Sequence, residues 1–187
     1  MNNYYRSIPS EEHSDFESFY RMIADWAPAG AWMAELGISD GRGIILMASL
    51  MSNIGKDCHI WAVDDFSYGG DYQRNVVETN IRNSDEGTIE IIAEDSLKAV
   101  GRCQDGQFDF VFIDSSHLYE LTKAEIRVWI HKLKLTGRLA GHDYQDNEQV
   151  RKAVDELIPK ELLHVENTSN GHGVWWVEKK DITNLFR

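Results

Sequence analysis

Short apolar runs alternate with segments of helical periodicity along most of this chain, which limits the folds open to it. The connections are short, so successive runs are expected to lie parallel in one sheet with helices on both faces, an α/β fold. Residues 162–180 instead predict two strands joined by a polar turn, an antiparallel hairpin at the sheet edge. The parallel strands are predicted at 31–38, 59–64, 88–95, 108–114 and 137–143, and the longer helices between them at 43–55, 71–85, 120–133 and 147–158.

Length and composition favour a single domain spanning residues 1–187. Hydrophobic residues make up 42% of the chain, enough for a sizeable core. Residues of about 10–27 place Phe16, Phe19 and Tyr20 on one helical face, which predicts an N-terminal helix that could cap a binding site. No apolar run approaches the ~20 residues needed to span a bilayer, so no membrane association is expected.

Charge and cysteine content exclude several classes of protein. The net charge is −12, from 19 Lys+Arg against 31 Asp+Glu. Nucleic acid is therefore a poor partner, because phosphate binding needs a basic face. Cys58 and Cys103 form neither a disulfide framework nor a metal-type spacing, and the N-terminus lacks the apolar segment of a signal peptide. A cytoplasmic protein is expected.

Ligands of such sheets bind beyond the carboxyl ends of the strands, and polar residues gather at those positions here. The first predicted strand ends in "AELGISDGRG", with Glu35 at its tip and Gly37 and Gly41 following. Glycines let the backbone turn sharply and approach a ligand closely. A plain strand-to-helix turn is the alternative interpretation of the glycines.

The second and third predicted strands end in acids that suit a nucleoside. Asp64 and Asp65 stand where a carboxylate can accept hydrogen bonds from a ribose diol. Glu94, Asp95 and Ser96, in "AEDS", stand where the edge of an adenine could be recognised. The alternatives are a helix N-cap or a solvated loop acid at the second strand and a helix cap at the third.

The fourth predicted strand, in "FDFVFIDSSHLYE", delivers Asp114 and then His117, and the fifth ends in "GHDYQD" with His142 and Asp143. Asp114, His142 and Asp143 are candidate ligands of a divalent metal ion with open sites for substrate. His117 has the intrinsic pKa of a general base near neutral pH. The alternative is that these groups are hydrogen-bonded structural residues.

With all five strand ends in view, the sequence resembles class I S-adenosylmethionine-dependent methyltransferases over roughly residues 30–178. It is most similar to small-molecule O-methyltransferases of the cephalosporin-hydroxylase and macrolide-sugar type. The resemblance rests on "ELGISDGRG", "VDDF" and "AEDS", and most specifically on "FDFVFIDSSHLYE" paired with "LKLTGRLAGHDY".

The resemblance implies a Rossmann-like three-layer sandwich, with a seven-stranded, mostly parallel sheet and an antiparallel last strand. It implies that S-adenosylmethionine is bound and that a small hydroxylated acceptor is methylated. Asp114 and the pair His142-Asp143 match the family's metal-binding positions for Mg²⁺ or Mn²⁺, Asp114 also bordering the cofactor, and His117 matches its general base. The cofactor pocket would be lined by Glu35, Gly37, Gly41, Asp64, Asp65, Asp95 and Ser96.

The sequence departs from the family pattern in two respects. His142 stands where relatives carry an oxygen ligand, which suits manganese or zinc better than magnesium, or no metal at all. The chain also has no obvious lid insertion. Substrate recognition is therefore expected from the N-terminal helix, from the 65–75 loop, or from a second subunit of a homodimer.

Three other functions remain open from the residues. A nicotinamide-dependent oxidoreductase shares the glycine turn and ribose acid, but its glycine spacing differs. A non-catalytic nucleotide- or partner-binding module on the same fold would not need His117 and Asp143. A metal-dependent hydrolase would use these residues with Asp114 and His142, but would not need the acids at the second and third strands.

Overall fold

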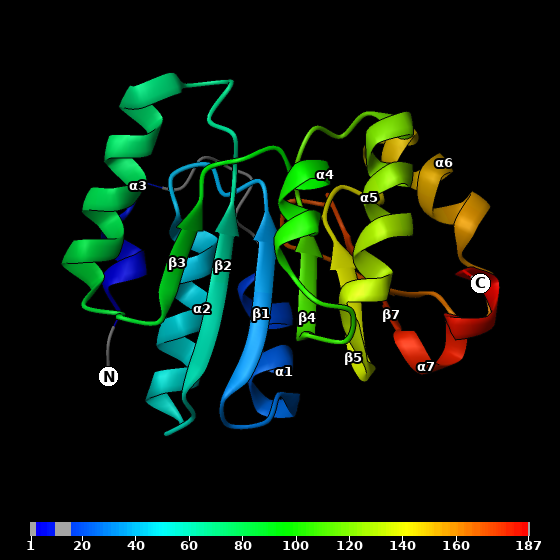
Figure 1. The fold of residues 1–187 in the computed structure, drawn as a ribbon, viewed down its shortest axis with the longest axis horizontal. Coiled ribbons are helices and arrows are strands. Elements are labelled where there is room, and N and C mark those ends of the chain that lie inside the picture. The colour runs from blue at the N-terminus through cyan, green and yellow to red at the C-terminus, as the bar shows by residue number, and fades with distance from the viewer. Residues whose placement is uncertain (1–2, 10–15, 187) are drawn as a thin grey trace.

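The computed structural model describes residues 3–9 and 16–186, and its centre is a seven-stranded sheet (Figure 1). The strand order is β3-β2-β1-β4-β5-β7-β6. The chain therefore moves outward from β1 to β3 and then returns to β4 on the other side of β1. The strands are β1 Ala31–Leu36, β2 Cys58–Val63, β3 Ile89–Ile92, β4 Phe108–Ile113, β5 Leu133–Gly141, β6 His164–Glu166 and β7 Val174–Glu178.

Strands β1 to β5 all run parallel to one another, whereas β7 runs antiparallel to its neighbours β5 and β6. This confirms the predicted mostly parallel sheet with an antiparallel last strand. The strand order reverses beside β1 and β4, so the carboxyl ends of these two strands form the switch point of the sheet. Ligand sites of open α/β sheets lie at such a point.

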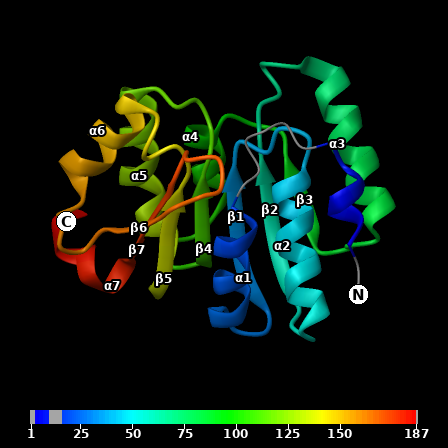
Figure 2. The same cartoon turned by 180° about the vertical axis from the view of Figure 1, so that it is seen from behind.

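Helices cover both faces of the sheet, which gives three layers (Figures 1 and 2). Alternate residues of β4 show why, because Phe110 and Phe112 pack on the α1–α2 side, while Val111 and Ile113 pack on the α5–α6 side. A strand buried on both faces reads as a continuous apolar run. The α-helices are α1 Glu17–Trp26, α2 Arg42–Asn53, α3 Gly70–Ser84, α4 Ser96–Ala99, α5 Tyr119–Lys132, α6 Glu148–Leu157 and α7 Lys179–Ile182.

The structure differs from the sequence prediction at several elements. Strand β5 begins at Leu133 and not at 137, because Leu133 is buried and pairs with Phe108 before the register shifts. Helix α1 is part of the predicted N-terminal helix, whose residues 10–15 lie outside the described residues. The pattern did not predict α7 or three short 3₁₀ helices, η1 Tyr4–Ser7, η2 Val100–Arg102 and η3 Thr183–Phe186.

Across the part of the chain that the structure describes, no helix combines the length and the apolar character needed to cross a membrane.

Candidate active site

A cavity of about 1080 Å³ opens at the carboxyl ends of the parallel strands. It receives side chains from all five parallel strand ends and from the turn between β6 and β7. The predicted site residues that line it are Glu35, Gly37, Asp64, Asp65, Asp95, Ser96, Asp114, His117, His142 and Asp143. Glu94, predicted beside Asp95 and Ser96, also lines the cavity, as do four acids that were not predicted, Asp40, Glu125, Asp146 and Glu148.

Gly41 is the one predicted site residue that is not among the lining residues. Its backbone is left-handed, with φ of 84°, and it is the N-cap of α2. A side chain there would meet Val77 and Ile44. The structure therefore places Gly41 at the turn that starts the helix, which is the plain structural interpretation of that glycine.

Gly37, by contrast, needs to be a glycine for two reasons. Its φ is 82°, in the region that L side chains rarely adopt, and an added Cβ would lie 2.2 Å from the carbonyl oxygen of Asp114. The loop after β1 therefore runs directly against the end of β4. This contact places the glycine loop and the Asp114 turn at one cavity.

Glu35 is a buried acid beneath the glycine loop, 6% exposed. The hydroxyl of Tyr20, from α1, donates to its Oε2 at 2.6 Å. An added Cβ on Gly43 would lie 2.5 Å from its Oε1, so this glycine makes room for the carboxyl. Burial raises the pKa of Glu35 to about 8, although the hydrogen bond from Tyr20 opposes this shift.

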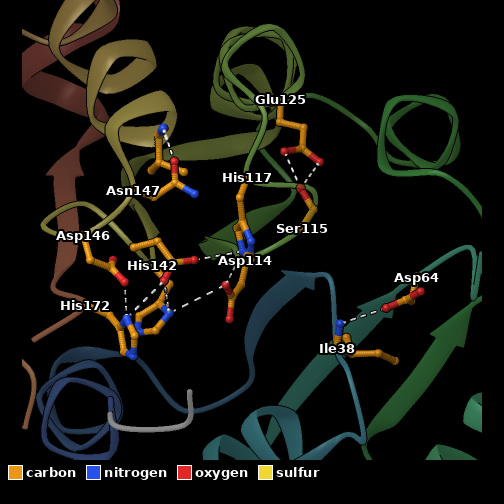
Figure 3. Close-up of polar contacts among 12 residues, drawn as sticks. Ile38, Asp64, Asp114, Ser115, His117, Glu125, His142, Asp146, Asn147 and His172 are labelled. Atoms are coloured by element: carbon orange, nitrogen blue, oxygen red, sulfur yellow. Dashed lines mark hydrogen bonds and ion pairs between the residues drawn. The ribbon is translucent and has the colours of Figure 1, made fainter. Parts of the chain in front are cut away.

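Asp64 and Asp65, at the end of β2, have different hydrogen-bond partners. Asp64 accepts hydrogen bonds from the backbone N–H groups of Ile38 at 3.0 Å and Phe66 at 2.7 Å, so it joins the loops after β1 and β2. Figure 3 shows the first of these contacts. Asp65 is exposed and accepts a hydrogen bond from the backbone N–H of Ser67 in the same turn, and hydrogen bonding to Ser67 lowers its pKa. Both carboxylates line the cavity.

A buried acid that was not predicted holds Ser96, which follows the third strand. Glu125 of α5 is 2% exposed, and it accepts hydrogen bonds from the hydroxyls of Ser96 and Ser115. Figure 3 shows its contact with Ser115. Burial raises the pKa of Glu125. Asp95 caps α4 by accepting from Leu97 N–H at 3.0 Å, and it also lines the cavity. The signal for Glu125 was its position on the apolar stripe of α5, next to Ile126.

The loops after β4 and β5 bring His117 between two carboxylates (Figure 3). Its Nε2 lies 3.2 Å from Oδ1 of Asp114 and 2.9 Å from Oδ2 of Asp143. The hydrogen bonds to Asp114 and to Asp143 raise the pKa of His117 to about 10. Burial would raise the pKa of Asp143, but the hydrogen bonds from His117 and His142 lower it well below its usual value. Without a metal ion, the group is therefore an imidazolium between two carboxylates at neutral pH.

Two further histidines complete the polar cluster. His142 is 2% exposed, with its Nδ1 3.3 Å from Asp143 and 3.8 Å from Asp114. His172, from the turn before β7, contacts Asp146 and lies 3.8 Å from Asp143. Asp146 was not predicted as a site residue, because nothing in the local pattern shows that the β6–β7 turn reaches it.

The cavity fits S-adenosylmethionine, because its glycine loop leaves no room for a side chain where it meets β4, and carboxylates follow at the second and third strand ends. A divalent ion also fits. Asp114, His117 and Asp143 each offer one ligand atom, and these atoms all lie within 4.8 Å of one another. Carboxylate oxygens with one imidazole suit a hard or borderline ion.

A family model described as a methyltransferase domain matches residues 34–144. This stretch is more than half of the 187 residues, and it runs from β1 to the turn after β5 with every predicted site residue inside it. The chain belongs to this family of methyltransferases. The predicted class I S-adenosylmethionine-dependent enzyme is thereby confirmed, and the oxidoreductase, binding-module and hydrolase alternatives are set aside.

Solved structures share the fold of this methyltransferase at low sequence identity. The cofactor-bound Rv0187 protein from MTB is 16% identical, with a TM-score of 0.72 over 92% of this chain and 82% of that one. A Staphylococcus aureus protein, provisionally named a caffeoyl-CoA O-methyltransferase, is 14% identical, with a TM-score of 0.68 over 92% and 87%. An rRNA methylase from Streptococcus thermophilus is 11% identical, with a TM-score of 0.66 over 90% and 98%. No curated protein sequence matches the chain.

Proposed function

We propose that this methyltransferase transfers the methyl group of S-adenosylmethionine to a hydroxyl oxygen of a small molecule. The observation that carries the proposal is the contact of Gly37 with the Asp114 turn, since it sets the cofactor loop beside Asp114, His117 and Asp143. Methyl transfer is an in-line displacement, and much of its rate comes from aligning donor and acceptor. Because the cofactor loop lies beside Asp114, His117 and Asp143, a bound donor and acceptor would be next to each other.

In this proposal the cofactor lies along the ends of β1, β2 and β3. Asp65, with Asp64, accepts hydrogen bonds from the ribose hydroxyls, and Asp95 accepts from the adenine amino group. Glu125 acts indirectly by holding Ser96 and Ser115 in place.

Asp114 and Asp143 would hold a divalent ion, Mg²⁺ or Mn²⁺, with His142 as a further ligand and His117 left as the base. When bound, such an ion lowers the pKa of a coordinated hydroxyl and orients it. His117 can accept the hydroxyl proton only as the neutral imidazole. A bound ion would compete with the protonated His117 for the carboxylate oxygens of Asp114 and Asp143. His117 could act as a base only if the ion takes those oxygens and the imidazole loses its proton.

The acceptor is proposed to be a small molecule and not a nucleic acid. The support is the net charge of −12, because a nucleic-acid backbone is bound by lysine and arginine. The likeness to an rRNA methylase concerns the fold, at 11% identity. Sites and substrates are not inherited with a fold.

Calorimetric titration with S-adenosylhomocysteine, with and without Mn²⁺, tests the proposal. Wild type and His117→Asn are expected to bind it equally, while methylation of hydroxylated compounds by labelled donor falls at least about 100-fold in the variant. Mn²⁺ should raise the melting temperature of wild type but not of Asp114→Asn. If His117→Asn abolishes cofactor binding, His117 belongs to the cofactor pocket and the base role is wrong.

A further inference from the structure

The cavity wall is predominantly acidic, and its His117 imidazolium lies between the carboxylates of Asp114 and Asp143. Eleven carboxylates line the cavity, and among the described residues that line it there is no lysine or arginine. The sequence of residues 10–15, "SEEHSD", contains no basic residue other than a histidine. Burial raises the pKa of Glu35 to about 8 and also raises that of Glu125, so the negative charge comes mainly from the other acids, of which Asp143 is 8% exposed and lies inside the wall. A ligand in this cavity therefore meets a strongly negative potential.

The proposed cofactor and ion account for only part of this charge. S-adenosylmethionine contributes a sulfonium and an ammonium against one carboxylate, and the ion would lie between Asp114 and Asp143. Glu94 has Arg102 as its own counter-ion. Acids nevertheless remain on the side of the cavity away from the glycine loop, where β5 leads into α6.

Asp146 and Glu148 are the acids on that side. Both are exposed and line the cavity, four and six residues after His142. Asp146 contacts His172, and Glu148 is the first residue of α6, after Asn147, whose side chain caps the helix by accepting from Gln149 N–H at 3.0 Å. Within residues 3–9 and 16–186, neither carboxylate is paired with a lysine or arginine. An acceptor beside Asp143 would lie next to these two acids.

We infer that the acceptor is an amine-bearing alcohol, cationic at neutral pH, and that phosphorylated and CoA-linked alcohols are excluded. The inference rests on the proposed function and names its substrate class. Opposite charge steers a ligand into a focused field, whereas like charge in a cavity opposes binding. Phosphate groups are recognised by Arg and Lys, which this cavity lacks among its described lining residues. The Staphylococcus aureus protein named for caffeoyl-CoA therefore resembles this chain in fold, and we infer that the two differ in acceptor.

Matched probes test the inference with the full-length protein, labelled S-adenosylmethionine and Mn²⁺. Glucosamine and dopamine are each compared with the N-acetylated and the O-phosphorylated compound. The expected result is that kcat/KM for a free amine exceeds that for its N-acetylated counterpart at least about tenfold and falls with ionic strength. The phosphorylated compounds should not be methylated.

Charge-removing variants provide the second readout. Asp146→Asn with Glu148→Gln should lower kcat/KM for the amine and reduce the preference over the N-acetylated probe. Glu161→Gln removes the same type of charge outside the cavity and should change neither value. Equal turnover of amine and N-acetylated probes, turnover of the phosphorylated ones, or no turnover of any amine while S-adenosylhomocysteine still binds would overturn the inference. Failure to bind S-adenosylhomocysteine would instead reject the proposed function.

Discussion

Nε2 of His117 lies 2.9 Å from Oδ2 of Asp143, and both residues have a left-handed backbone, with φ of 56° and 60°. Residues other than glycine rarely adopt this conformation, and it costs of order 1–3 kcal/mol at each. The loops after β4 and β5 are therefore both strained where they meet. Such strain persists where the surrounding contacts hold the residue, and it is common at functional sites.

The charge state of His117 predicts a pH dependence of stability. Its pKa is about 10 in the folded protein and about 6.5 when unfolded, so the folded state binds the proton more tightly. The stabilisation is fully present below about pH 6.5 and is lost as the pH rises through about 10. Because the side chain is 43% exposed, solvent screening reduces the contribution to about 1–2 kcal/mol.

Urea unfolding of wild type and His117→Asn, both in EDTA, measures this contribution. Asparagine tolerates the left-handed backbone, so the variant isolates the imidazole. The difference in unfolding free energy should shrink steadily between about pH 6 and about pH 10. A difference that does not change with pH would show that His117 is not held as an imidazolium.

Gly37→Ala should abolish cofactor binding, and Gly30→Ala is its matched control. Both glycines have a positive φ, 82° and 73°, so both variants incur the backbone cost of about 1 kcal/mol. Only at Gly37 would the new Cβ meet another backbone atom, the Asp114 carbonyl oxygen at 2.2 Å; at Gly30 nothing lies within 4 Å. Thermal melts and calorimetry with S-adenosylhomocysteine should show the larger loss in Gly37→Ala. Equal losses in the two variants would contradict the proposed role of Gly37 in the cofactor loop.

Glu125→Gln tests whether the buried acid positions the cofactor pocket. The amide replaces Oε2, which also accepts from the Ser115 hydroxyl, with a donor, so one of the three hydroxyl–carboxylate hydrogen bonds is lost at a cost of about 0.5–1.5 kcal/mol. We expect lower stability and weaker binding of S-adenosylhomocysteine. Glu120→Gln, an exposed change on the same helix, serves as the control. Lower stability with unchanged cofactor affinity would assign Glu125 a purely structural role.

Local pattern was sufficient for most of the fold. The run "FDFVFID" predicts a strand covered on both faces, and β4 is buried on both faces. The pattern failed at β5, where the helical periodicity of residues 120–133 was extended to Leu133, although Leu133 already pairs with Phe108 in the sheet. Pairing between distant segments decided that boundary, and local periodicity does not report it.

All the predicted site residues except Gly41 line the cavity because parallel strands end at one edge of their sheet. Glu125 was missed because it belongs to a helix face, and its importance depends on how α5 packs against two strand ends. Asp146 and His172 were not paired for a similar reason, since they are far apart along the chain and meet only where the β6–β7 turn folds back.

The sequence by itself determined the order of strands and helices, the acidic character of the chain and the residues at the strand ends. These follow from side-chain periodicity and composition, which are local properties. Only the tertiary structure decided that His117 lies between Asp114 and Asp143, and is therefore protonated and not neutral. The same holds for the absence of lysine and arginine among the described residues of the cavity wall. The physical reason is that electrostatic interactions depend on distances between residues that are separated along the chain.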